Sequence, residues 1–147
     1  MDRAAAAGGR LAGYAAISDI PDRGGDIVRR GAFGAGAGAG IPLLWQHGAD
    51  RPVGRLLRAE EDRRGLRILA QFAAGSRGAA EAAALVRGGA LTGLSFGYRT
   101  RKARRDRVRG LRELLSVELV EVSLVTFPMQ PLARVVGLFE EEERENA

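Results

Sequence analysis

Apolar and polar residues alternate along two adjacent segments of the chain, residues 52–59 (PVGRLLRA) and 65–72 (GLRILAQF). A period of two is typical of a strand with one buried face, and the charged EEDRR between the segments suits a hairpin turn. Apolar runs also predict strands in residues 10–18, 41–46, 91–98 and 112–126, followed by a short segment at 133–139.

One helix is predicted, in residues 77–88 (RGAAEAAALVRG). The segment is rich in alanine, the best helix former, and Ala80, Ala84 and Leu85 recur at helical spacing. Residues 34–40 (GAGAGAG) hold too much glycine for a stable helix or packed strand, so they predict a flexible surface loop. Many strands with one main helix indicate an α+β fold that is mostly β and barrel-like.

The composition excludes several classes of site. The 147 residues include no cysteine and one histidine. Disulfides and thiolate chemistry are therefore excluded, and a structural zinc site has too few ligands. The N-terminal residues lack the apolar core of a signal peptide, and no run reaches the roughly 20 apolar residues of a membrane span. We expect a soluble protein of intracellular type, without metal or other cofactor.

Charge is unevenly distributed. Residues 140–147 carry five Glu and one Arg, a net −4, which leaves +9 for residues 1–139. We expect a single domain over 1–139 and a disordered acidic tail over 140–147. Residues 99–112 hold eight Arg or Lys against one Asp, which could attract nucleic acid or an acidic protein segment. No aromatic residue interleaves with these cations, so base stacking is not indicated, and a solvated hairpin is the simpler interpretation.

Three polar residues are candidates for chemistry. His47 ends an apolar strand, Ser95 lies between Gly93 and Gly97, and Glu121 lies within the aliphatic LVEVSLV. A serine hydroxyl becomes nucleophilic when a base takes its proton, histidine suits that role near neutral pH, and a carboxylate can orient the imidazole. Each residue also has a structural interpretation, as a strand-end histidine, a serine at a bend and an edge glutamate.

The ordered blocks GDIVRRGAF, PLLWQHG, PVGR, GALTGLSFGY and VELVEVSLVTFPMQPLA closely resemble the HK97-type prohead proteases of tailed phages, a family also found in prophages and gene transfer agents. The resemblance implies the fold of herpesvirus assemblin, a small β-barrel. It also implies a serine endopeptidase that trims the scaffold-like N-terminal segment of the major capsid protein.

The family's motifs map onto individual residues of this chain. The resemblance makes His47 the general base, Ser95 the nucleophile and Glu121 the orienting acid, with Glu118 as the alternative acid. Three residues apart on an extended strand, Glu118 and Glu121 are expected to face opposite sides. Space around Ser95 makes Gly93, Phe96 and Gly97 a candidate region for substrate and oxyanion. Arginine assists the oxyanion in assemblins, but neither Arg99 nor Arg134 is supported beyond its nearness in sequence.

The resemblance implies the major capsid protein as substrate, inside the assembling procapsid in the cytoplasm of the bacterial host. Portal or other procapsid components and a second copy of the chain are further implied partners, whereas a membrane and nucleic acid are not expected. Two alternatives remain: a non-enzymatic procapsid assembly factor, and a nucleic-acid-binding β-barrel that uses residues 99–112.

Overall fold

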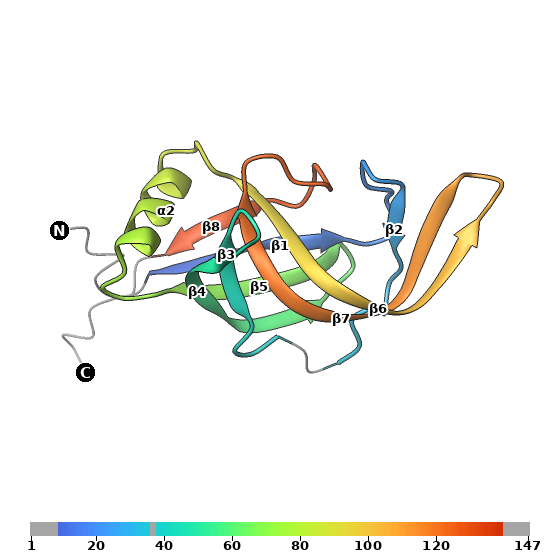
Figure 1. Cartoon of the computed structure of the whole chain (residues 1–147), viewed down its shortest axis with the longest axis horizontal. Helices are drawn as coiled ribbons and strands as arrows, with labels where there is room; N and C mark the ends of the chain where they lie inside the picture. The colour runs from blue at the N-terminus through green and yellow to red at the C-terminus, as the bar shows by residue number, and fades with distance from the viewer. Residues whose placement is uncertain (1–8, 36–37, 140–147) are drawn as a thin grey trace.

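The computed structural model describes residues 9–35 and 38–139, so the predicted acidic tail and the middle of the glycine-rich loop lie outside the described residues. The described chain forms an eight-stranded sheet and one α-helix (Figure 1). In chain order the elements are β1 (Arg10–Ile17), β2 (Asp26–Val28), β3 (Pro42–Trp45), β4 (Gly48–Glu61), β5 (Gly65–Phe72), α2 (Arg77–Arg87), β6 (Gly93–Asp106), β7 (Leu111–Val125) and β8 (Val135–Phe139).

Strand β7 organises the sheet. One of its edges pairs with β6 along almost its whole length, while the other edge pairs in parallel first with β2 and then with β3. From β3 the sheet continues through β4, β5 and β1 to β8 by antiparallel pairing. Strand β7 therefore lies between the end of β3, which precedes His47, and the first residues of β6, which carry Ser95.

The mostly-β α+β class is confirmed. The predicted barrel is not, because the sheet stays open. Among the described residues, the start of β6 meets the start of β8 through an isolated bridge, Gly93 with Arg134, and two backbone hydrogen bonds, from Leu94 N to Ala133 O and from Val135 N to Thr92 O. Beyond Leu94, strand β6 follows β7 away from β8, so these two elements cannot continue as a ladder.

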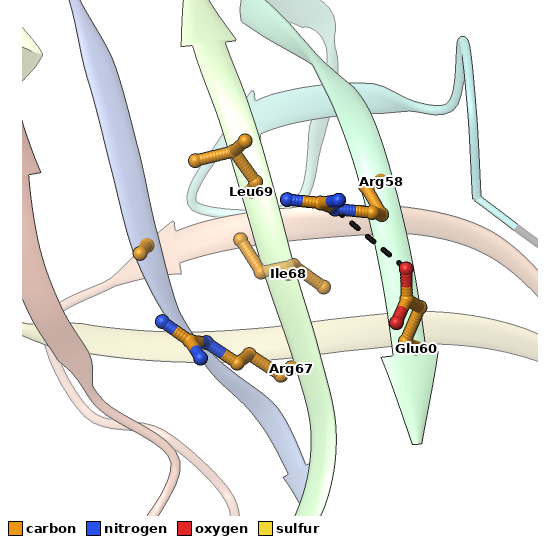
Figure 2. Close-up of a pocket in the computed structure, with 6 residues that line it drawn as sticks. Arg58, Glu60, Arg67, Ile68 and Leu69 are labelled. Atoms are coloured by element: carbon orange, nitrogen blue, oxygen red, sulfur yellow. Dashed lines mark ion pairs between the residues drawn. The ribbon is translucent and has the colours of Figure 1, made fainter. Parts of the chain in front are cut away.

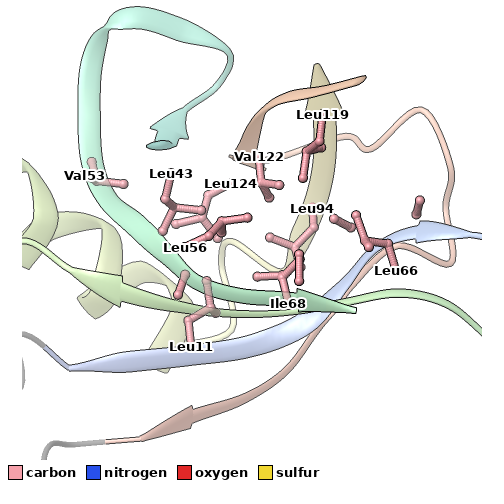
Figure 3. Packing of buried hydrophobic residues seen from close by; sticks show 14 of the residues in the cluster. Leu11, Leu43, Val53, Leu56, Leu66, Ile68, Leu94, Leu119, Val122 and Leu124 are labelled. Carbon is pink, nitrogen blue, oxygen red and sulfur yellow. The ribbon is translucent and has the colours of Figure 1, made fainter. Parts of the chain in front are cut away.

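The core lies within the curve of the sheet (Figure 3). The alternation predicted for β5 is confirmed, because every second residue from Leu66 to Phe72 is buried. Side chains from several strands meet in this cluster, among them Leu11, Leu43, Leu56, Ile68, Leu94 and Leu124.

Helix α2 forms where it was predicted, with Ser76 as its N-cap accepting a hydrogen bond from Ala79 N. Its buried face does not include the three residues whose spacing predicted the helix. The residues that pack inward are Ala79, Ala82, Ala83 and Val86, whereas Leu85 is 40% exposed. In an alanine-rich helix the apolar stripe is poorly defined by sequence, so packing decides the rotation.

Strands β6 and β7 continue past the body of the molecule as a two-stranded arm (Figure 1), paired out to Asp106 and Leu111. The basic hairpin predicted there is present, with longer strands than expected. Buried Glu113 accepts hydrogen bonds from Arg104 and Arg29, which lower its pKa to about 2. These ion pairs tie Arg104 on β6 and Arg29, which follows β2, to Glu113 on β7.

Candidate active site

His47 occupies the two-residue turn between β3 and β4, where Trp45 pairs with Gly48. Gln46 and His47 both have positive φ, 50° and 60°. Two-residue hairpin turns of this hand normally use Asn and Gly, because a side chain is strained in the left-handed region. Strain of this kind persists where surrounding contacts fix the backbone, and it is common at functional sites.

The contacts that fix the turn come from the end of β7. Gln46 N donates to Leu124 O at 2.9 Å. The Gln46 side chain donates from Nε2 to Thr126 Oγ1 at 2.7 Å and accepts from Thr126 N at 3.2 Å. The three hydrogen bonds of Gln46 therefore help to hold the neighbouring His47 in place.

Glu121 and His47 are brought together. Glu121 Oε1 lies 2.5 Å from His47 Nδ1, and the carboxylate is buried while the imidazole is about half exposed. The hydrogen bond to Glu121 raises the pKa of His47 above 6.5, against the lowering effect of burial. A carboxylate on Nδ1 leaves Nε2 as the ring atom that can take a proton from a nucleophile.

Ser123 was not singled out by sequence. It is fully buried, its Oγ donates to Glu121 Oε2 at 2.7 Å, and the same atom accepts from His47 N at 3.1 Å. The available signal was its position two residues from Glu121, which places both side chains on one face of a strand. That signal does not identify a function, because a buried serine on a strand is common.

Ser95 lies directly opposite Ser123 in the β6–β7 ladder. Side chains of such a pair share a face of the sheet, so the Ser95 hydroxyl is on the same side as Glu121 and Ser123. Ser95 is half-buried and lines, together with His47 and Phe96, a cleft of about 450 Å³. The cleft has room for a peptide segment beside the candidate nucleophile.

The two glycines that flank Ser95 do not leave the open space predicted from sequence. A Cβ on Gly97 would lie 2.6 Å from Glu121 Oε1, and a Cβ on Gly93 would lie 2.6 Å from Val125 O. Gly97 therefore makes room for the carboxylate, and Gly93 for the close approach of β7. An oxyanion role for the backbone near these residues stays a prediction.

The lining of the cleft also includes Asp22, Asp26 and Tyr98. Arg112 makes a bidentate ion pair with Asp26, and Tyr98 hydrogen-bonds to the same carboxylate. Burial, with a smaller contribution from Asp26, raises the pKa of Tyr98 above 10. Asp22 caps its loop by accepting from two backbone N–H groups. Two carboxylates therefore line the cleft, and the one of Asp26 is paired with Arg112.

The alternative acid and the two arginines lie elsewhere. Glu118 forms exposed ion pairs with Arg99 and Arg101, at 3.3 and 3.5 Å, and makes no contact with His47. Arg134 donates to Pro131 O and to Thr92 Oγ1, near the start of β6. Neither Arg99 nor Arg134 lines the cleft.

A second hollow, of about 280 Å³, lies over β4 and β5, where Arg58 and Glu60 form an exposed ion pair near Arg67 (Figure 2). Its lining residues offer no serine hydroxyl and no imidazole, unlike the cleft that Ser95 and His47 share. Within the described ranges, no three His, Cys, Asp or Glu side chains gather as metal ligands. None of the described helices is long and apolar enough to span a membrane.

Known proteins resemble the chain in sequence and fold. It is 29% identical to the prohead protease of Enterobacteria phage HK97 over 88% of its length, and 30% identical to the capsid polyprotein of Pseudomonas phage PAJU2 over 84%. It spans 60% of the first protein and 19% of the second. The KSHV protease, solved with a hexapeptide phosphonate inhibitor, shares the fold: the TM-score is 0.57 and the identity 13%, with 88% of this chain and 64% of that one covered.

The model of one family, the caudovirus prohead serine protease, matches residues 1–146. Because this match covers nearly the whole chain, the chain belongs to the caudovirus prohead serine protease family.

Proposed function

We propose that the chain is a serine endopeptidase in which Ser95 is the nucleophile, His47 the general base and Glu121 the residue that orients His47. The observation that carries the proposal is the 2.5 Å contact between Glu121 Oε1 and His47 Nδ1, in a cleft that Ser95 also lines. One carboxylate, the chain's single imidazole and one hydroxyl are the groups that acyl transfer requires.

The reaction follows from these groups. His47 Nε2 accepts the Ser95 proton as Oγ attacks the scissile carbonyl carbon, and Glu121 stabilises the resulting imidazolium. The imidazolium then protonates the leaving amine, the C–N bond breaks, and water hydrolyses the acyl-enzyme by the same route. Backbone N–H groups around Gly93, Phe96 and Gly97 are our candidates for the oxyanion site.

The proposed substrate is the major capsid protein, cut at its scaffold-like N-terminal segment inside the assembling procapsid in the host cytoplasm. Support comes from the names of the relatives, a prohead protease and a capsid polyprotein. Because the chain spans only part of each relative, substrate and partners are inferred from the family rather than from this site.

The test co-expresses the chain with the major capsid protein of the phage or phage-derived element that encodes it, and reads processing by N-terminal sequencing of the product. Ser95→Ala and His47→Ala should each reduce cleavage by at least about 10⁴-fold, because the members of such a unit act together. Unchanged cleavage in Ser95→Ala would refute the proposal.

The third residue has a matched control. Glu121→Gln should be milder, about ten- to a hundredfold, because it removes one charge-assisted hydrogen bond. Glu118→Gln should leave cleavage near normal, since the ion pairs of Glu118 within the described residues are with the exposed Arg99 and Arg101. The opposite ranking of these two variants would transfer the orienting role to Glu118.

A fluorophosphonate probe supplies an assay that needs no known cleavage site. Ser95 Oγ forms a bond to phosphorus, fluoride leaves, and the proton passes to His47. Labelling at Ser95, mapped by mass spectrometry and absent in His47→Ala, is the expected result. A non-enzymatic assembly factor would not be labelled, and a nucleic-acid-binding protein would instead show binding that weakens steeply with salt.

A further inference from the structure

Ser123 is a fully buried polar residue that the proposed reaction does not use. It lies on β7 between Val122 and Leu124, two members of the hydrophobic core cluster. A hydroxyl at such a position is costly unless both its hydrogen and its lone pairs are engaged. The groups that hydrogen-bond to the Ser123 hydroxyl therefore indicate what this residue does.

Both partners belong to the candidate active site. The hydroxyl hydrogen is committed to Glu121 Oε2 at 2.7 Å, and a lone pair of the same oxygen accepts from His47 N at 3.1 Å. One atom thus joins the carboxylate to the backbone of the base.

The geometry points to Ser123 as a positioning residue, whose hydroxyl holds the Glu121 carboxylate and the His47 turn in the arrangement that proton transfer requires; this inference rests on the proposed function. Bonding to Oε2 fixes the carboxylate so that Oε1 faces His47 Nδ1. Bonding to His47 N fixes the left-handed residue that carries the imidazole. Removing the Ser123 hydroxyl would loosen both Glu121 and His47, the two partners of the hydrogen bond between Oε1 and Nδ1.

The experiment uses Ser123→Ala in the full chain and two measurements. The first is the kinetics of fluorophosphonate labelling at Ser95. The maximal labelling rate should fall by about tenfold or more, while the concentration for half-maximal rate stays unchanged, since Ser123 does not line the cleft.

The second measurement is the titration of His47 by NMR, which is unambiguous because the chain has one histidine. If the carboxylate is no longer held, the pKa of His47 should fall toward 6.5. Asp22 and Asp26, the other carboxylates that line the cleft, are untouched, so the shift would report the Glu121 contact. A merely structural serine would leave the pKa unchanged.

Matched variants distinguish a positioning role of the Ser123 hydroxyl from a packing role of its side chain. Ser123→Thr keeps the hydroxyl and should retain both the labelling rate and the pKa, while Ser116→Ala, half-buried on the same strand, should behave as the wild type. Should the alanine variant lose its fold, Ser123→Cys, which keeps the size but weakens the hydrogen bonds, carries the same expectation.

A normal labelling rate together with an unchanged or higher His47 pKa in Ser123→Ala would overturn the inference. Failure of the proposed function would show differently, as persistent cleavage in Ser95→Ala. The titration involves no substrate, so it tests Ser123 whichever way the cleavage experiment ends.

Discussion

Replacing Gly97 by alanine should inactivate the site without removing any of its functional groups. Gly97 pairs with Glu121 across the β6–β7 ladder, and a Cβ at Gly97 would lie 2.6 Å from Glu121 Oε1 and 2.9 and 3.0 Å from Cγ and Cδ. Three atoms of one side chain would be too close. Rotating the carboxylate alone cannot relieve the contact with Cγ, so the whole side chain must move.

The size of the effect follows from these distances. Ordinary contact begins near 3.4 Å, so Oε1 has to retreat by about 0.8 Å from a position only 2.5 Å from His47 Nδ1. A charge-assisted hydrogen bond contributes about 1.5–3 kcal/mol, and each 1.4 kcal/mol of barrier is tenfold in rate. Loss of most of this bond should slow Ser95 labelling by about ten- to a hundredfold.

Two assays read the outcome together. The labelling rate of Gly97→Ala should approach that of Glu121→Gln, and the pKa of His47 should fall toward 6.5. Gly78→Ala is the control, because a Cβ there meets only Ser76 Oγ at 3.9 Å. A labelling rate within about twofold of wild type, with an unshifted His47 in a folded protein, would show that the carboxylate does not act through the position that Gly97 leaves open.

Charged groups and the helix provide three further predictions. Because a general base must be neutral, Ser95 labelling should increase as pH rises through the pKa of His47, at a midpoint above 6.5 that moves down in Glu121→Gln. The ion pair between His47 and Glu121 should stabilise the fold fully below pH 6.5, and this contribution should be lost as pH rises through the folded-state pKa of His47. Glu113, with a pKa of about 2, should stabilise the fold fully above pH 4.5 and progressively less down to pH 2, so the melting temperatures of wild type and Glu113→Gln should converge in acid. Gly78→Ala should raise stability by about 0.5–1 kcal/mol in a denaturant titration, since it removes a helix glycine without a clash.

The strands were predictable because their apolar residues alternate, but strand parity does not distinguish Glu118 from Glu121, the two candidate acids on β7. Core residues there include Leu114, Val117, Leu119, Val122 and Leu124, with two intervals of three. The register shifts between Gly97 and Tyr98, leaving Val120 without a partner between Leu119 and Glu121. Such an extra residue breaks the alternation, so counting from Glu118 to Glu121 does not give opposite faces. Their partners distinguish the two acids instead. Glu118 forms ion pairs with Arg99 and Arg101, whereas Glu121 contacts His47.

The sequence pointed to His47 but gave no indication of the turn that presents it. Gln-His lacks the Asn-Gly signal of a two-residue hairpin, and two non-glycine residues in the left-handed region cost about 2–4 kcal/mol together. That cost is offset by four hydrogen bonds from β7 and the residue that follows it, to the backbone and side chain of Gln46 and to His47 N, at about 0.5–1.5 kcal/mol each. All of these partners lie far along the chain from the turn, so local propensity could not reveal them. The turn is therefore stable only when β7 is in place, and the strand that carries Glu121 is also the strand that shapes the backbone of the base.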